Sequence, residues 1–86
     1  MVKPIHISGH AHFEIKRRGI RRAEVIAAIR SPGQVLPSAK GQSIYQCLVG
    51  RSGRMLLRVV AKEDARAYHV VTAYKTSKVA KYWRTP

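Results

Sequence analysis

Residues 54–75 read RMLLRVVAKEDARAYHVVTAYK, and this stretch decides the fold. From Arg54 to Lys62 every second residue is apolar, which is typical of a strand with one buried face. Residues 63–65 turn the chain. The last part, Arg66–Lys75, is rich in β-branched and aromatic residues and predicts a second strand. A turn this short joins antiparallel strands, so the two are expected to pair.

Outward from this pair, the sequence predicts helices before it, further strands, and a last helix after it. The expected elements are a short strand at 5–7, a helix from His10 to Arg18 capped by Ser8, a helix from Arg21 to Arg30, an edge strand at Val35–Leu36, a strand over Gln42–Val49 with a hairpin turn at 50–53, and a helix from Ser77 to Arg84. The predicted fold class is α+β, with two N-terminal helices, an antiparallel sheet of three to four strands and a short C-terminal helix.

The charge of the chain is its strongest compositional feature. The chain has 86 residues, so a single domain over 1–86 is expected, and it carries 17 Lys and Arg against four acidic residues. The formal charge of +13 is far more than solubility requires. The basic residues are spread along the whole chain, which indicates a charged folded surface that meets phosphates, anionic lipid or an acidic partner chain.

Other compositional features narrow the classes of protein. Cys47 is the only cysteine, so no disulfide framework is possible, and its apolar surroundings predict a buried strand residue. The histidines and this cysteine lack the close spacing of a zinc site. No apolar stretch approaches the roughly 20 residues that cross a bilayer, and the start of the chain does not resemble a signal peptide. A reducing, cytoplasmic location is therefore expected.

The predicted strand Arg54–Lys62 places Arg54, Arg58 and Lys62 on one face. A charged face on a central strand has two explanations. The face binds phosphate, with arginine giving bidentate contacts, or it is a solvated face across which the arginines lie.

The last predicted helix carries a comparable basic stripe, formed by Lys78, Lys81 and Arg84 with Lys75 just before it. This stripe could follow a phosphate backbone, or it could simply be solvated. It lacks the apolar lipid-facing side of a membrane-binding helix.

Thr72 and Tyr74 lie on the same face at the end of the predicted strand Arg66–Lys75, where polar groups are well placed to meet a ligand. RNA cleavage without a metal needs a base for the 2′-hydroxyl proton, an acid for the leaving 5′-oxygen, and cations for the phosphorane. A histidine, Arg58 or Lys75, Thr72 and Tyr74 would supply this set.

The histidines have competing interpretations. His10 and His12 open the first helix, and His10 and Glu14 are spaced i,i+4, so the carboxylate could orient the imidazole. Histidines at this position are otherwise surface or capping residues. His6 and His69 alternate with strand apolars and are predicted to be satisfied core or rim residues.

These residues together resemble a known group. The chain resembles a small bacterial domain family in a series of short motifs. They are His10-Ala11, Arg18-Gly19-Ile20, Glu24-Val25, Ser31-Pro32 and the strand Val70–Tyr74. The pattern is similar to the barnase–EndoU–colicin–RelE-like metal-independent ribonucleases, which include toxins of toxin–antitoxin and contact-dependent inhibition systems. The resemblance implies two helices packed on a curved antiparallel sheet, with the active site on its concave face.

Carried over by position, His10 matches the family histidine, Arg18 the second arginine of the motif, and Thr72 and Tyr74 the closing pair. Glu14 stands where the family has its first arginine. Either Arg17 or Arg58 takes over the role of that arginine, or Glu14 acts with His10 as an acid–base pair.

The predicted function is therefore a metal-independent endoribonuclease without cofactor, acting as a toxin whose partner is an acidic antitoxin or immunity protein. The alternative is a non-catalytic RNA- or ribosome-binding module on the same scaffold. The predicted catalytic residues are His10, Glu14, Arg18, Thr72 and Tyr74. The predicted RNA-binding residues are His12, Arg17, Arg54, Arg58, Lys75, Lys78 and Lys81.

Overall fold

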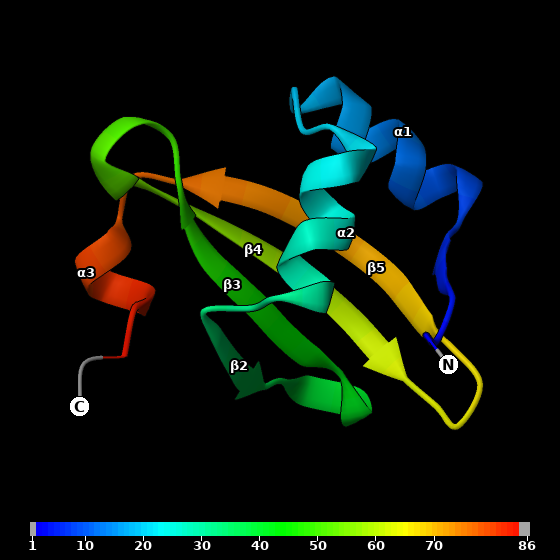
Figure 1. The fold of residues 1–86 in the computed structure, drawn as a ribbon. Helices are drawn as coiled ribbons and strands as arrows, with labels where there is room; N and C mark the ends of the chain where they lie inside the picture. Colours follow the sequence, from blue (N-terminus) through cyan, green and yellow to red (C-terminus); the bar gives the residue numbers. More distant parts are fainter. Residues whose placement is uncertain (1, 85–86) are drawn as a thin grey trace.

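In the computed structural model, which describes residues 2–84, the stretch at 54–75 forms the middle of a five-stranded sheet (Figure 1). β4 (Met55–Glu63) pairs antiparallel with β5 (Tyr68–Thr76), as the sequence predicts. The strand order is β1-β5-β4-β3-β2. The α+β class, with two helices before the main strands and a short one after them, is confirmed.

The strands on the far side of β4 also follow the prediction. β3 (Ser43–Val49) pairs antiparallel with β4, and the predicted turn between them contains the short helical segment η2 (Arg51–Gly53). β2 (Gln34–Pro37) pairs with β3 at the edge and is followed by η1 (Ala39–Gly41).

The first strand corrects the prediction of a purely antiparallel sheet. β1 (Ile5–Ile7) pairs parallel with residues 68–70 of β5, so the sheet is mixed and has five strands rather than three or four. A run of three residues carries no signal for strand direction. The long connection from β1 to β5, through both helices and three strands, allows the parallel pairing that a short turn could not.

The two N-terminal helices begin and end close to the predicted positions. In α1 (Gly9–Arg17), the Ser8 hydroxyl accepts the Ala11 backbone N–H at 3.1 Å, and Gly19, at φ 71°, follows the C-cap. α2 (Arg22–Arg30) lies across β4, and α1 lies beside β5 (Figure 1).

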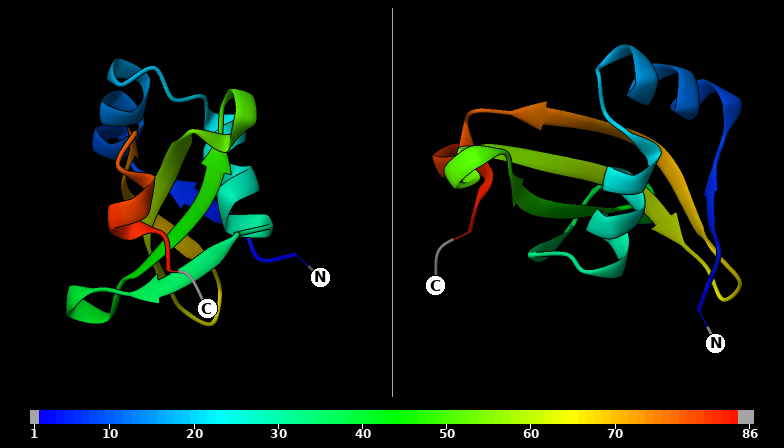
Figure 2. Two further views of the ribbon diagram at one scale, coloured as in Figure 1. Left: turned by 90° about the vertical axis from the view of Figure 1, so that its left-hand side faces the viewer. Right: turned by 45° about the horizontal axis from the view of Figure 1, so that its top comes forward.

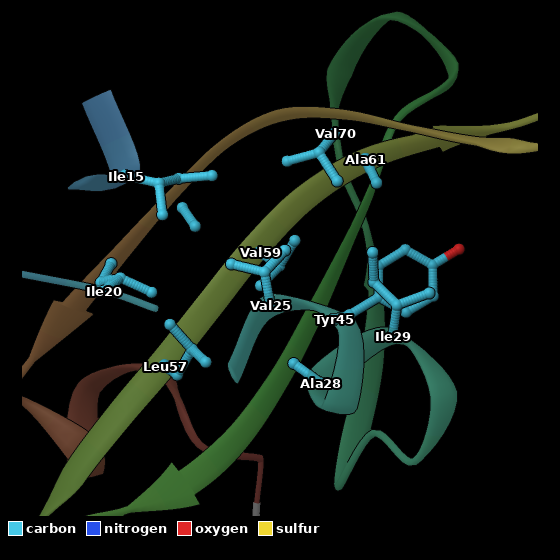
Figure 3. Close-up of a cluster of buried hydrophobic side chains, with 11 residues drawn as sticks. Ile15, Ile20, Val25, Ala28, Ile29, Tyr45, Leu57, Val59, Ala61 and Val70 are labelled. Carbon is cyan, nitrogen blue, oxygen red and sulfur yellow. The ribbon is translucent and has the colours of Figure 1, made fainter. Parts of the chain in front are cut away.

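The core lies between these helices and one face of the sheet (Figure 3). Ile15, Val25 and Ile29 from the helices meet Leu57 and Val59 from β4. This leaves Phe13 on the outer side of α1 with 64% of its surface exposed, because it lies opposite the buried stripe.

The C-terminal helix is shorter than predicted. α3 spans Val79–Tyr82, and Ser77 does not cap it. The N–H of Lys78 instead bonds the Thr76 hydroxyl, and Trp83 adopts an extended backbone that ends the helix after one turn. The Trp83 ring lies against Gly33, where an added Cβ would come within 2.8 Å of the indole.

We call the sheet face opposite α1 and α2 the distal face. Figure 2 (left) shows α3 and α2 on opposite sides of β3 and β4. The register places one row of paired side chains on the distal face, because their neighbours in each strand belong to the core. This row includes Gln34, Gln46, Arg58 and Tyr74.

Candidate functional site

Arg58 is the centre of the distal face. Its guanidinium is buried, with only 7% of the residue exposed. Nε donates to the Gln46 side-chain oxygen at 2.9 Å, and Nη1 donates to the Tyr74 hydroxyl at 2.5 Å. The Tyr82 ring covers it, with its centroid 4.1 Å from Cζ. Among residues 2–84 the charge has no carboxylate partner, so it is held entirely by neutral and aromatic groups.

Two glutamines connect Arg58 to the C-terminal segment. The Gln46 amide donates to the Gln34 side chain at 2.8 Å and to the Tyr82 carbonyl at 3.1 Å. Gln34 in turn bonds both the N–H and the carbonyl of Arg84. In the described part of the chain, no buried side-chain nitrogen or oxygen lacks a partner. The network therefore fixes the position of Arg58 and ties α3 over β2 and β3.

Arg18 meets Thr72 at the outer edge of β5. Within residues 2–84, β1 pairs only with residues 68–70, and the rest of β5 has no neighbouring strand on that side. Arg18, the C-cap of α1, fills this place. Its Nη1 donates at 3.0 Å to the Thr72 hydroxyl and at 3.0 Å to the Ala73 carbonyl. Two residues predicted to be catalytic are thus in direct contact.

Glu14 belongs to the same corner but pairs with arginines. Its Oε2 accepts from Arg17 Nη2 at 2.7 Å and lies 3.8 Å from Arg18 Nη2. The hydrogen bond from Arg17 lowers the pKa of the Glu14 carboxyl below its ordinary value. Within the described residues, no hydrogen bond joins Glu14 to His10. His10 is exposed and lies eight residues before Arg18, or about 12 Å along the helix axis.

A β-bulge at Val71 changes which residues face Thr72. Ala61 pairs with Val70, but Val60 pairs with Thr72, so Val71 is an extra residue in β5. The bulge shifts the alternation of β5 by one residue. Residues that strict alternation would put on opposite faces of the sheet therefore share a face when the bulge lies between them. His69, paired with Lys62, therefore lies on the same distal face as Thr72 and Tyr74.

His69 and its neighbour are rim residues rather than core residues. Both His6 and His69 are exposed, and their rings lie 5.5 Å apart on paired positions of β1 and β5. His69 Nε2 is 2.9 Å from the Asp64 carboxylate in the β4–β5 turn. Strict alternation along the sequence would put His69 and Thr72 on opposite faces of the sheet. The bulge brings them to one face, and no residue type in this segment signals it.

Asp64 organises the β4–β5 turn. Its carboxylate accepts the backbone N–H groups of Arg66 and Ala67, each at 2.8 Å, and contacts His69. The bond from the Arg66 N–H, followed by those from His69 and Ala67, lowers the pKa of Asp64 from 3.8 to about 2. The carboxylate is therefore ionised throughout the neutral and mildly acidic range.

The lowered pKa of Asp64 predicts a pH dependence of stability. A carboxyl whose pKa falls on folding stabilises the folded state above its unfolded pKa, about 3.9, and the contribution is lost as the pH falls through about 2. We expect Asp64→Asn to unfold more easily than wild type at pH 7. This difference should shrink as the pH is lowered from about 4 to about 2, in urea titrations read by circular dichroism. A difference that stays constant over this range would contradict the assignment.

The remaining predicted RNA-binding residues are not gathered at this site. Lys75 lies on the helix side and pairs with Glu24 at 3.0 Å. His12 lines a pocket between α1 and α2. Arg54 precedes β4, and the exposed Lys78 and Lys81 belong to the C-terminal segment.

The other predictions concern Cys47, metals and membranes. Cys47 lies in β3 but is half-buried rather than buried, and partial burial raises the pKa of its thiol. Residues 2–84 contain no cluster of three or more His, Cys, Asp or Glu side chains arranged to hold a metal ion. None of the helices in this part of the chain has the length and apolar character needed to span a membrane.

Comparison with known proteins gives a family but no characterised relative. A model of the family described as "Domain of unknown function (DUF4258)" matches residues 7–75, which include α1, α2 and nearly all of the sheet. No curated protein and no solved structure gives a match. The match extends over most of the chain, from the last residue of β1 to Lys75 in β5, and the protein belongs to the DUF4258 family.

Proposed function

We propose that this domain is a metal-independent endoribonuclease that cleaves RNA by attack of the 2′-hydroxyl, and that it acts as a cytoplasmic toxin. Two findings support the proposal. The chain resembles the barnase–EndoU–colicin–RelE-like ribonucleases in its His-Ala, Arg-Gly-Ile and Val-Thr-x-Tyr motifs. Its distal face also presents paired arginine, threonine and tyrosine side chains in a chain of charge +13.

One observation carries the proposal: a buried arginine donates directly to the hydroxyl of Tyr74. If Tyr74 gives its proton to a leaving oxygen, the negative charge that forms on the phenol meets the Arg58 guanidinium at 2.5 Å. Arg58 is buried and Tyr74 is half-buried, and this partial removal from water strengthens the contact. A tyrosine serving only to pack the sheet would not require a charged donor at its hydroxyl.

Arg18 and Thr72 lie beside this tyrosine. Thr72 and Tyr74 are two residues apart on one face, or about 7 Å along the strand. The N–H groups of Arg18 that do not bond Thr72 and Ala73 can hold the phosphate and the charge of the phosphorane. Tyr74 then donates its proton to the 5′-oxygen as the phosphorus–oxygen bond breaks.

The second candidate function is RNA binding without cleavage. It is favoured by the position of His10, which lies in the first turn of α1, whereas Arg18 is the C-cap of that helix. The affinity of such a module should fall with salt at roughly −0.7 in log–log slope per phosphate contacted on a single strand.

The excess positive charge also supports an acidic protein partner. An antitoxin or immunity protein with a surplus of Asp and Glu would be attracted to the same arginines that meet RNA. In a gene neighbourhood, a small acidic reading frame beside this one is the expected arrangement.

The test is to incubate the purified protein with total RNA in a metal chelator and to map the fragment ends. Discrete fragments with 2′,3′-cyclic phosphate ends are expected. Arg18→Gln should abolish them, whereas Arg30→Gln, an exposed arginine at the end of α2, should not. Intact RNA that still shifts in a gel would favour the binding module, and RNA that neither shifts nor breaks would reject both functions.

A further inference from the structure

The cleavage reaction proposed above needs a base near Arg18 and Thr72. His10, the histidine indicated by the sequence motif, lies about 12 Å from Arg18 along the axis of α1. The bulge in β5 brings another histidine to the correct face. His69 pairs with Lys62 and Thr72 pairs with Val60, so the two are separated by the equivalent of two strand positions, about 7 Å.

This spacing makes the row along β5 symmetrical about Thr72. Tyr74 lies about 7 Å from Thr72 in one direction and His69 about 7 Å in the other. Arg18 bonds the threonine in the middle. A phosphodiester held by Arg18 would thus have a tyrosine on the side of one bridging oxygen and an imidazole on the side of the attacking hydroxyl. In-line displacement requires acid and base on opposite sides of the phosphorus in this way.

His69 is also held and polarised by a carboxylate. Asp64 lies 2.9 Å from Nε2 and is itself fixed by two backbone N–H groups of the turn. An ionised carboxylate can only accept, so Nε2 carries the proton and Nδ1 keeps its lone pair. Asp64 would stabilise the imidazolium that forms when Nδ1 takes a proton.

The other titratable groups around this imidazole are basic residues, which suits an anionic substrate. His6 stands beside it on β1, with ring centroids 5.5 Å apart, and Lys62 is paired with it on β4. Lys3 bonds the Asp64 carbonyl at 2.9 Å and holds the turn from the N-terminal side. His69 is itself half exposed, with 48% of its side chain accessible, so RNA can reach it.

We propose that His69, oriented by Asp64, is the general base of RNA cleavage by this domain. This rests on the proposed ribonuclease function. His69 Nδ1 takes the proton of the 2′-hydroxyl as that oxygen bonds to phosphorus. The bond from phosphorus to the 5′-oxygen breaks, and that oxygen takes the Tyr74 proton. The products are a 2′,3′-cyclic phosphate and a 5′-hydroxyl. His69 is left protonated and Tyr74 ionised, and solvent restores both.

The experiment compares His69→Ala with His10→Ala in single-turnover cleavage of RNA, beside filter binding of the same RNA. His69→Ala is expected to cleave about 10²- to 10⁴-fold more slowly with unchanged RNA affinity, since the imidazole moves a proton and does not hold the phosphate. Added imidazole should restore part of the rate. The acidic limb of the wild-type pH–rate profile should be absent from His69→Ala.

The outcomes separate the two proposals. If wild type does not cleave RNA, the ribonuclease function fails and this inference fails with it. If wild type cleaves and His69→Ala cleaves equally well, only the assignment of the base is overturned. A loss in His10→Ala but not in His69→Ala would return that role to α1. A loss in His69→Ala that imidazole does not restore, with unchanged pH profile, would show a structural role and also overturn the inference.

Discussion

Tyr74→Phe is expected to slow RNA cleavage by about 10²- to 10⁴-fold while leaving the fold and the RNA affinity intact. The Tyr74 phenol is the proton donor in the proposed reaction, and its hydroxyl is the only group that the substitution removes. Its hydrogen bond from Arg58 would be lost, but the guanidinium keeps its bond to Gln46 and its contact with the Tyr82 ring. The measurement is the single-turnover rate on a short RNA whose cleavage site has been mapped, with circular dichroism of the variant.

Tyr82→Phe provides the matched control. It removes a hydroxyl from a second tyrosine that contacts the same arginine but keeps the ring over the guanidinium. Its rate should stay within about threefold of wild type, because this hydroxyl has no part in the proton transfer. Equal losses in both variants would indicate that the rate responds to any disturbance around Arg58. Full activity in Tyr74→Phe would remove Tyr74 from the site.

Leu57→Ala is expected to lower the free energy of unfolding by about 2–5 kcal/mol. Leu57 is fully buried in β4 and packs in the cluster shared with both N-terminal helices. Truncation leaves a cavity in a core that a chain of 86 residues can only make small. Because small domains are stable by only about 5–15 kcal/mol, the loss should be visible as a large fall in the urea midpoint with an unchanged slope.

Leu48→Ala makes the same substitution outside this core. Leu48 lies in β3 with 43% of its surface exposed. It should cost about 1 kcal/mol or less. If the two variants unfolded at similar urea concentrations, the core could not lie where the register of β4 places it.

Most of the sheet could be predicted because β3, β4 and β5 follow one another with short turns. Alternation along each strand and the turn residues between them were enough to give order and direction. The same signals failed at the ends of the chain. β1 is three residues long, too short to indicate direction, and the C-terminal helix ends after one turn because Trp83 packs against Gly33. That contact joins residues far apart in the sequence.

The candidate site was predictable only in part. Thr72 and Tyr74 were placed together by their spacing of two, and the alternation also put Arg58 on a charged face. The sequence did not predict that Arg58 would be buried beneath Tyr82, which depends on where α3 docks. His69 was predicted only to be a core or rim residue, because strict alternation sets it apart from Thr72 and does not include the bulge at Val71. No residue type marks such an insertion, since it arises from the pairing of two strands.

The contact between Arg18 and the Ala73 carbonyl has a consequence for solubility. In the described part of the chain, no strand lies beside β5 beyond β1, and a strand edge of this kind can recruit a strand from another molecule. Arg18 occupies a hydrogen-bonding position on that edge and places a positive charge there. If Arg18 holds the phosphate as proposed, the same side chain also hinders the pairing of this edge with a strand of a second molecule. Replacing Arg18 would then remove the proposed phosphate contact and open this strand edge at the same time, so a loss of activity at this position should come with increased self-association.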